Sequence, residues 1–204
     1  MIKMENNEIK VFNRWSMEGV EVQDPGLKRY ISLDQKIVPR TGGRYARNRF
    51  HKSKMFIIER LMNKIQNPGH KGKKHFKTSG HCTGKGSKIY NLMEKTLEII
   101  EKKTGKNPVE VTVKAIENGA PREEILMIEY GGAHYPRPVE VAPQRRVDFA
   151  LRLLVQSSYH KSFNSKKDFV SVFADEIINA YNSSNQAQVI SKKHELERQA
   201  DSSR

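Results

Sequence analysis

Residues Glu124–Val155, EILMIEYGGAHYPRPVEVAPQRRVDFALRLLV, indicate the fold class most clearly, because the hydrophobic period changes along them. Over 124–141, apolar residues recur at every second position on either side of the glycines at 131–132, which is the pattern of a β-hairpin or ribbon. Pro136 and Pro138 fit this interpretation, since both strands of a two-stranded ribbon are edges and edges tolerate proline. An isolated ribbon is marginal in water, so it must lean on other elements.

Helical spacing resumes directly after the ribbon. From Pro143, one apolar face is marked by Val147, Ala150, Leu151, Leu154 and Val155. We expect a further helix over about 166–181 and a last, mostly polar one over about 185–200.

Three helices are predicted between about Lys54 and the ribbon. The first runs from about Lys54 and stops at Asn67-Pro68-Gly69, and the second ends at Gly105. The third begins at Asn107-Pro108, an N-cap followed by proline at the first helical position. Val109, Val111 and Val113 also alternate as they would in a strand. We predict a helix because of the N-cap.

The expected fold is therefore mainly α, a small helical bundle with an inserted two-stranded β-ribbon and an extended N-terminal arm. We place the arm, with one short helix around Leu27, at 1–39. The domain at 40–204 then includes a Gly/Lys/His-rich surface loop at 69–88.

Positive charge is concentrated in one part of the chain. The net charge of the whole sequence is +14, and residues 40–88 hold fourteen basic residues against one acid, Glu59. Because unpaired like charges repel in a compact state, this concentration predicts a docking surface for a polyanion, with nucleic acid as the first candidate. A disordered basic tail, a nuclear-import patch and a membrane-surface helix are the alternatives. The apolar residues at helical spacing, and the position of the only tryptophan elsewhere, at Trp15, argue against them.

Other protein classes are disfavoured by composition. The single Cys82 excludes an internal disulfide framework, and no apolar run approaches the roughly 20 residues that span a bilayer. The first ten residues lack the apolar core of a secretory signal. We expect a soluble, intracellular protein without membrane contact.

The first group of candidate phosphate ligands precedes the first helix: Arg40, Arg44, Arg47, Arg49, Lys52 and Lys54. We expect this segment to be helical, which would put Arg40, Arg44 and Arg47 on one face. Guanidinium groups bind phosphate oxygens in bidentate fashion. The neighbouring aromatics, Tyr45 and Phe50, could stack on unpaired bases or anchor the segment, and for Phe50 a place in the core is the preferred interpretation.

The second group lies in and after the basic loop: Lys71, Lys73, Lys74, Lys85 and Lys88. Neither of its Gly-Lys runs has the spacing of a P-loop. His70, His75, His81 and Cys82 resemble a metal cluster, but the surrounding lysines would disfavour a cation, so we interpret them as ordinary exposed side chains and expect no metal site.

The third group follows the ribbon and consists of Arg145, Arg146 and Arg152, with ion pairs to Asp148 and neighbouring acids as the alternative interpretation. On the ribbon, His134 and Arg137 could reach a nucleic-acid groove or merely solvate an edge strand. No catalytic constellation or dinucleotide fingerprint has recognisable spacing, so we expect no catalytic residues and no cofactor.

Several runs resemble one known family. GGAHYPRPVEV at 131–141, followed by PQRR at 143–146, is similar to the universal small-subunit ribosomal protein family numbered seven in bacteria. KVFNRWS at 10–16, GRYA at 43–46 and VISKKHELER at 189–198 resemble its archaeal and eukaryotic branch, called ribosomal protein five in eukaryotes. The matches are collinear over nearly the whole chain.

The resemblance implies a structural protein of cytoplasmic ribosomes that binds the 3′ major domain of small-subunit rRNA and helps assemble the head beside proteins of the head and platform. Arg44, Arg47 and Arg49, the run Gly72-Lys73-Lys74, and Arg145 with Arg146 match rRNA-contact positions. The ribbon residues Gly131, Gly132, His134, Tyr135 and Arg137 match the part near exit-site tRNA and mRNA.

Two segments depart from the family pattern. The loop at 70–87 is longer than usual and holds two Gly-Lys runs, and Ser157–His160 replaces a segment rich in small residues. Beside the ribosomal hypothesis, an autonomous nucleic-acid-binding regulator and an rRNA-modifying enzyme are the competing functions.

Overall fold

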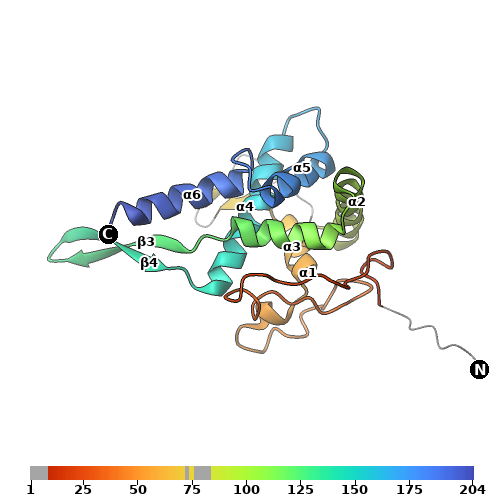
Figure 1. Ribbon diagram of the computed structural model, residues 1–204, viewed down its shortest axis with the longest axis horizontal. Coiled ribbons are helices and arrows are strands. Elements are labelled where there is room, and N and C mark those ends of the chain that lie inside the picture. Colours follow the sequence, from red (N-terminus) through yellow and green to blue (C-terminus); the bar gives the residue numbers. More distant parts are fainter. Residues whose placement is uncertain (1–8, 72–73, 76–83) are drawn as a thin grey trace, which may run out of the picture.

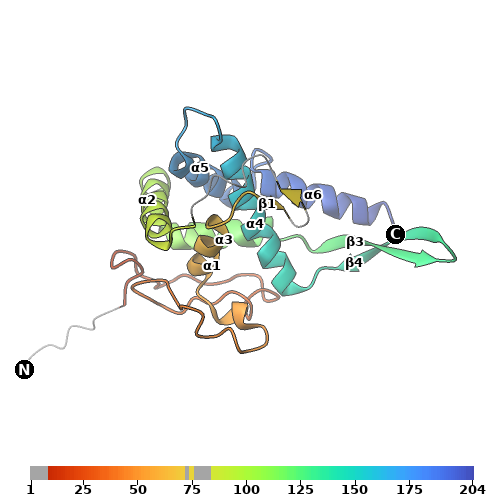
Figure 2. The same ribbon diagram turned by 180° about the vertical axis from the view of Figure 1, so that it is seen from behind.

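The computed structural model describes residues 9–71, 74–75 and 84–204, with side chains described for 9–69 and 84–204. In these residues a helical body carries a β-ribbon that projects from one end (Figures 1 and 2). The elements are the 3₁₀ helix η1 (His51–Lys54), α1 (Ile57–Ile65), β1 (His70–Lys71), β2 (Lys74–His75), α2 (Gly86–Thr104), α3 (Pro108–Gly119), β3 (Glu123–Tyr130), β4 (Ala133–Glu140), α4 (Pro143–Ser162), α5 (Phe169–Tyr181) and α6 (Gln188–Asp201). The predicted fold class is confirmed. No helix in the described part of the chain is long and apolar enough to cross a membrane.

Helix α3 is the centre of the core, in contact with α2, α4, α5 and α6. Its start is fixed as expected, because the Asn107 side chain accepts a hydrogen bond from the Val109 amide at 3.0 Å. Val109 and Val113, one turn apart, are buried on one face of the helix, and Val111 is buried on another. Because the helix buries most of its circumference and leaves only the face of Glu110, Lys114 and Asn118 at least partly exposed, its buried alternate valines also fit a strand.

Helix α2 begins earlier than its apolar pattern, at Gly86, and ends where expected. Gly105 takes a left-handed conformation, φ 65°, and its amide donates to the Glu101 carbonyl at 2.8 Å. Before α2, part of the expected surface loop pairs as a short antiparallel ladder between β1 and β2.

The N-terminal arm is irregular but lies against the helices. Val11, Trp15, Leu27 and Ile31 are buried in the common core. The short helix expected around Leu27 is instead a succession of turns, since too few consecutive hydrogen bonds form there to propagate a helix.

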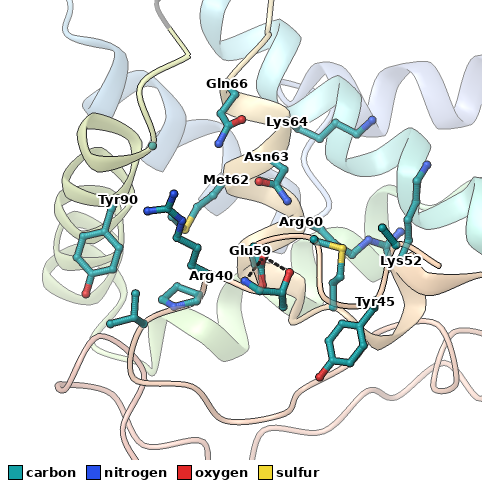
Figure 3. A pocket seen from close by; sticks show the side chains of 18 of the residues that line it. Arg40, Tyr45, Lys52, Glu59, Arg60, Met62, Asn63, Lys64, Gln66 and Tyr90 are labelled. Atoms are coloured by element: carbon teal, nitrogen blue, oxygen red, sulfur yellow. Dashed lines mark hydrogen bonds between the residues drawn. The ribbon is translucent and has the colours of Figure 1, made fainter. Parts of the chain in front are cut away.

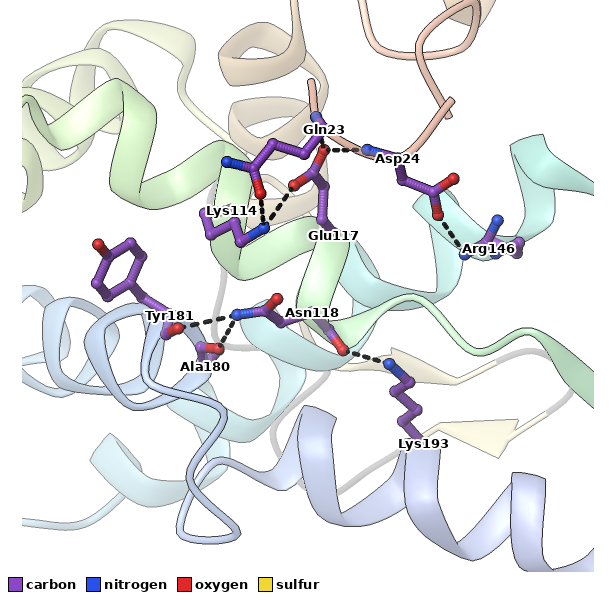
Figure 4. A network of polar contacts seen from close by, with 9 residues as sticks. All are labelled: Gln23, Asp24, Lys114, Glu117, Asn118, Arg146, Ala180, Tyr181 and Lys193. Carbon is purple, nitrogen blue, oxygen red and sulfur yellow. Dashed lines mark hydrogen bonds and ion pairs between the residues drawn. The ribbon is translucent and has the colours of Figure 1, made fainter. Parts of the chain in front are cut away.

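Glu117 of α3 fixes the middle of the arm. Its Oε1 accepts from the backbone amides of Gln23 at 2.6 Å and Asp24 at 3.1 Å (Figure 4). The arm is thus held by buried polar contacts as well as by apolar packing.

The prediction of a helix over the arginine-rich segment, 40–54, is wrong. Residues 42–50 form turns and bends, and only η1 is helical. Gly42, Gly43 and Phe50 have φ of 61°, 79° and 56°, in the left-handed region, and such residues interrupt a right-handed helix. Arg40, Arg44 and Arg47 therefore share no helix face.

The ribbon has the predicted two-residue turn. Tyr130 pairs with Ala133, and Gly131 and Gly132 have φ of 59° and 80°, as a type I′ turn requires at both central positions. Its base leans on α6, where the Arg122 amide donates to Glu197 Oε1 at 3.0 Å. Beyond Leu126 the ribbon is exposed to solvent.

Candidate nucleic-acid interface

Two adjoining grooves bring the basic segment against α1 and α4. The large groove, about 960 Å³, lies between residues 38–52, α1 and the start of α2 (Figure 3). The small groove, about 620 Å³, lies between residues 49–52, Lys64 and the first turns of α4. His51, Lys52, Lys64 and Asp148 line both grooves, so the two form one continuous surface.

Basic side chains outnumber acidic ones along this surface. The cations are Arg40, Arg49, Lys52, Arg60, Lys64, Arg145 and Arg152, and the acids are Glu59 and Asp148. Arg145 and Arg152 on α4 thus join a basic segment that lies about a hundred residues earlier in the sequence. Such a cationic groove suits a polyanion.

Asp148 holds the cationic surface together. Its Oδ1 accepts from Arg60 Nη2 at 3.1 Å and its Oδ2 from Lys52 Nζ at 3.3 Å. Burial acts to raise the pKa of Asp148, but Arg60, Lys52 and Lys64 outweigh it and hold this pKa below its ordinary value. Asp148 is therefore a charged anchor at neutral pH.

Arg60 is a structural member of this cluster. It is only 4% exposed, and it also donates to the Tyr30 carbonyl at 2.8 Å. Because its guanidinium is hydrogen-bonded to Tyr30 and Asp148, Arg60 positions Asp148 and is not free to bind a ligand.

Lys64, one helical turn after Arg60, lies where the two grooves meet. Burial lowers the pKa of Lys64, and although Asp148 acts to raise it, Lys52, Arg152 and Arg60 lower it further. An anion placed among these cations would relieve their mutual repulsion. Sequence reasoning missed Arg60 and Lys64, although both lie in the basic segment at helical spacing.

Glu59, the only acid of the basic segment, shapes the large groove. It is buried, and its Oε1 accepts from both the amide and the hydroxyl of Thr41 at 2.7 Å (Figure 3). These two bonds fix the start of the loop at 41–50. We did not predict this role of Glu59. The sequence signal for it was the position of a single acid among fourteen basic residues.

Arg40 and the arginines of this loop are available to a ligand. Arg40, Arg44, Arg47 and Arg49 are exposed, and no described side chain forms an ion pair with them. Arg40 lines the large groove and Arg49 the small one, whereas Arg44 and Arg47 lie on the loop outside both. Lys54, at the end of η1, is exposed as well.

Phe50 is not in the core, contrary to expectation. Its side chain is 60% exposed in the small groove, and the Arg49 guanidinium lies 5.4 Å from the centre of its ring. The left-handed backbone at Phe50 places it outside the helical register that the core interpretation assumed.

The three arginines of α4 have different roles. Arg145 and Arg152 are exposed in the small groove, with Arg145 Nη2 2.8 Å from Glu124 and Arg152 stacked over Phe149 at 5.5 Å. Arg146 instead is 9% exposed. It donates to the Pro121 carbonyl at 3.0 Å. It also donates to Asp24 Oδ2 at 2.8 Å (Figure 4). Arg146 therefore ties the arm to the ribbon base and is not available to the groove.

The remaining predicted cations do not line the two grooves or are only partly described. Lys85 and Lys88 are exposed at the start of α2, beside a hollow of about 280 Å³. The backbones of Lys71 and Lys74, with those of His70 and His75, form β1 and β2. Gly72, Lys73, His81 and Cys82 lie outside the described residues. Within those residues no group of three His, Cys, Asp or Glu side chains could hold a metal.

The predicted ribbon residues lie apart from the two grooves. Gly131, Gly132, His134, Tyr135 and Arg137 are all exposed on the projecting part of the ribbon, away from the residues that line the grooves (Figure 1). The structure thus brings together Arg40, Arg49, Lys52, Arg145 and Arg152 and leaves the ribbon apart from them.

Comparisons with known proteins place this architecture in one family. Residues 27–204 match the family model described as ribosomal protein S7p/S5e. The chain is 49% identical to the small ribosomal subunit protein uS7 of Nanoarchaeum equitans over 197 residues, which is 97% of this chain and all of that protein. It is 42% identical to the uS7 proteins of Archaeoglobus fulgidus and Methanosphaera stadtmanae, over 97% and 94% of this chain and 96% of each relative.

Proposed function

Since the chain belongs to the ribosomal protein S7p/S5e family and is a structural constituent of the small ribosomal subunit rather than an enzyme, we propose that its two grooves bind small-subunit rRNA. The continuous cationic surface between the arginine-rich loop, α1 and α4 carries this proposal. The expected location, in cytoplasmic ribosomes, follows from the family.

The mechanism is neutralisation of phosphate repulsion at a fixed place on a rigid scaffold. Arg40, Arg49 and Arg152 reach the backbone of the RNA, while the Arg60–Asp148 pair holds Lys52 beside them, next to Lys64. Binding to phosphates gives register and affinity without chemistry on the RNA. A helix junction clamped in this way keeps one conformation.

The finer parts of the proposal rest on the family resemblance and on the separation of grooves and ribbon. The grooves bind the 3′ major domain and help assemble the head, beside proteins of the head and platform. The ribbon, with His134, Tyr135 and Arg137 exposed, lies near exit-site tRNA and mRNA. A projecting ribbon can reach a neighbouring ligand while the helical body stays bound.

The test is rRNA binding by the full chain with Arg145→Ala and Arg152→Ala together. We expect weaker binding to a 3′ major domain fragment and a shallower dependence on salt, by about 0.7 to 0.9 in slope for each phosphate that is no longer neutralised. The matched control is Lys102→Ala with Lys167→Ala, which removes two exposed cations outside both grooves. Equal affinity and an unchanged slope in the groove variant would contradict the proposal.

The regulator hypothesis makes a different prediction for the native protein. A structural constituent sediments with small subunits in a lysate gradient, whereas an autonomous regulator stays near the top. We expect co-sedimentation, and its disappearance in the groove variant but not in the control.

A further inference from the structure

Phe50 is held in the small groove in a conformation that packing does not explain. Its φ of 56° and ψ of 28° lie in the left-handed region, which a bulky side chain rarely adopts. Its carbonyl accepts from the Ser53 amide at 3.0 Å and from the Ser53 hydroxyl at 2.8 Å, which secures the turn. The result is a mostly exposed aromatic ring at a fixed place on the surface.

A second aromatic ring lines the same groove. Phe149 of α4 lies under the Arg152 guanidinium, as Phe50 lies beside that of Arg49. Both rings are therefore paired with a cation, and Phe50 remains 60% exposed despite its cation. Arginine and phenylalanine side by side are the usual components of a surface on which bases stack.

The positive charge around Phe50 indicates which kind of ligand the small groove binds. Arg49, Lys52, Lys64, Arg145 and Arg152 surround the groove, and Asp148 is its one acid among the described residues. An apolar segment of a protein would leave these cations without counter-charges. A nucleotide supplies both a flat apolar face for the ring and a phosphate for its neighbours.

We propose that Phe50 is a stacking platform for one unpaired nucleobase of rRNA, with the flanking phosphates held by Arg49 and Arg152. This inference rests on the proposed function and adds to it a single-stranded nucleotide as the ligand of the small groove. Stacking tolerates any base, because every base has a π face.

The experiment compares Phe50→Leu with Phe50→Trp in the full chain bound to the rRNA fragment. Leucine keeps an apolar side chain at this position but cannot stack, so affinity should fall roughly 5- to 150-fold, the range for removal of one stacked base. The salt slope should stay unchanged, because every cation that faces a phosphate is still present. Tryptophan should retain the affinity, and its fluorescence should be quenched when RNA binds.

The matched control is Phe163→Trp, since Phe163 is an exposed phenylalanine that does not line the groove. We expect no quenching in that variant. If Phe50→Leu binds rRNA as the wild type does while Arg145→Ala/Arg152→Ala binds weakly, the stacking proposal is overturned and the rRNA function stands. If Phe50→Leu loses association with another ribosomal protein instead of with rRNA, the groove binds protein and the proposal is equally overturned.

Discussion

The hydrogen bonds of Glu59 show how one residue can determine the shape of a binding loop. Glu59→Ala leaves the Thr41 amide and hydroxyl without their buried acceptor, so we expect a decrease of about 1 to 3 kcal/mol in the free energy of unfolding. Amide exchange at Thr41 should accelerate in the same variant. Glu59→Gln keeps an oxygen for Thr41 and should preserve most of the protection. An unchanged exchange rate in Glu59→Ala would mean that other interactions hold the loop.

Asp148 gives the cationic cluster a defined dependence on pH. Although burial opposes ionisation, Arg60, Lys52 and Lys64 hold its pKa below the ordinary 3.8, so the folded state binds fewer protons than the unfolded state. The stabilisation is present above about pH 4 and is lost as pH falls through the lowered pKa.

We therefore expect Asp148→Asn to lower the free energy of unfolding by about 1 to 3 kcal/mol at neutral pH, because it removes a carboxylate bonded to Arg60 and Lys52. The gap between variant and wild type should close below pH 4 in denaturant titrations. The control is Asp175→Asn, whose exposed pair with Lys103 should contribute less than about 1 kcal/mol. A gap that persists at acid pH would show that geometry, not charge, explains the effect.

Helices α3 and α6 approach each other at a glycine. A Cβ at Gly119 would lie 2.6 Å from Cγ2 of the buried Val189, closer than packed atoms allow. Gly119→Ala should therefore destabilise the protein by about 1 to 3 kcal/mol through overpacking. Adding Val189→Ala should recover part of this stability, as a double-mutant cycle would measure.

The control is Gly86→Ala in the first turn of α2, where nothing lies within 4 Å of the added Cβ. That change should be neutral or slightly stabilising, because alanine favours helix over glycine. Equal effects at the two glycines would contradict close packing at Gly119.

Elements defined by local chemistry were predictable from the sequence. The cap at Asn107, the stop at Gly105 and the turn at 131–132 each involve only neighbouring residues, and the structure confirms all three. The prediction of a helix over 40–54 was wrong because the conformation of this segment depends on Glu59 and on residues with left-handed backbone. A hydrophobic pattern contains no information on either.

The site was predictable in composition but not in arrangement. The sequence indicates which stretch is basic, yet whether an arginine is exposed depends on distant partners. Arg146 is buried and donates a hydrogen bond to Asp24, 122 residues away, whereas Arg152 is exposed on the same helix. Phe50 and Lys64 belong to the groove only because α4 packs against α1.

The cationic grooves and the ribbon tip are separate parts of the molecule, so their functions should be separable. Residues 127–136 are all exposed, and Leu126 pairs directly with Arg137. Deleting residues 127–130 and 133–136 therefore links Leu126 to Arg137 through the same two glycines. The register of the remaining ribbon is preserved, because these two residues already pair.

We expect this shortened chain to bind the rRNA fragment with the affinity and salt slope of the wild type, since it keeps every residue that lines the grooves. Small subunits that contain it should lose cross-links from the ribbon to exit-site tRNA and mRNA. The groove variant Arg145→Ala/Arg152→Ala should behave in the opposite way, with weak rRNA binding and poor incorporation into subunits. If the shortened ribbon weakened rRNA binding as much as the groove variant does, the ribbon itself would be part of the rRNA interface and the division between the two sites would be wrong.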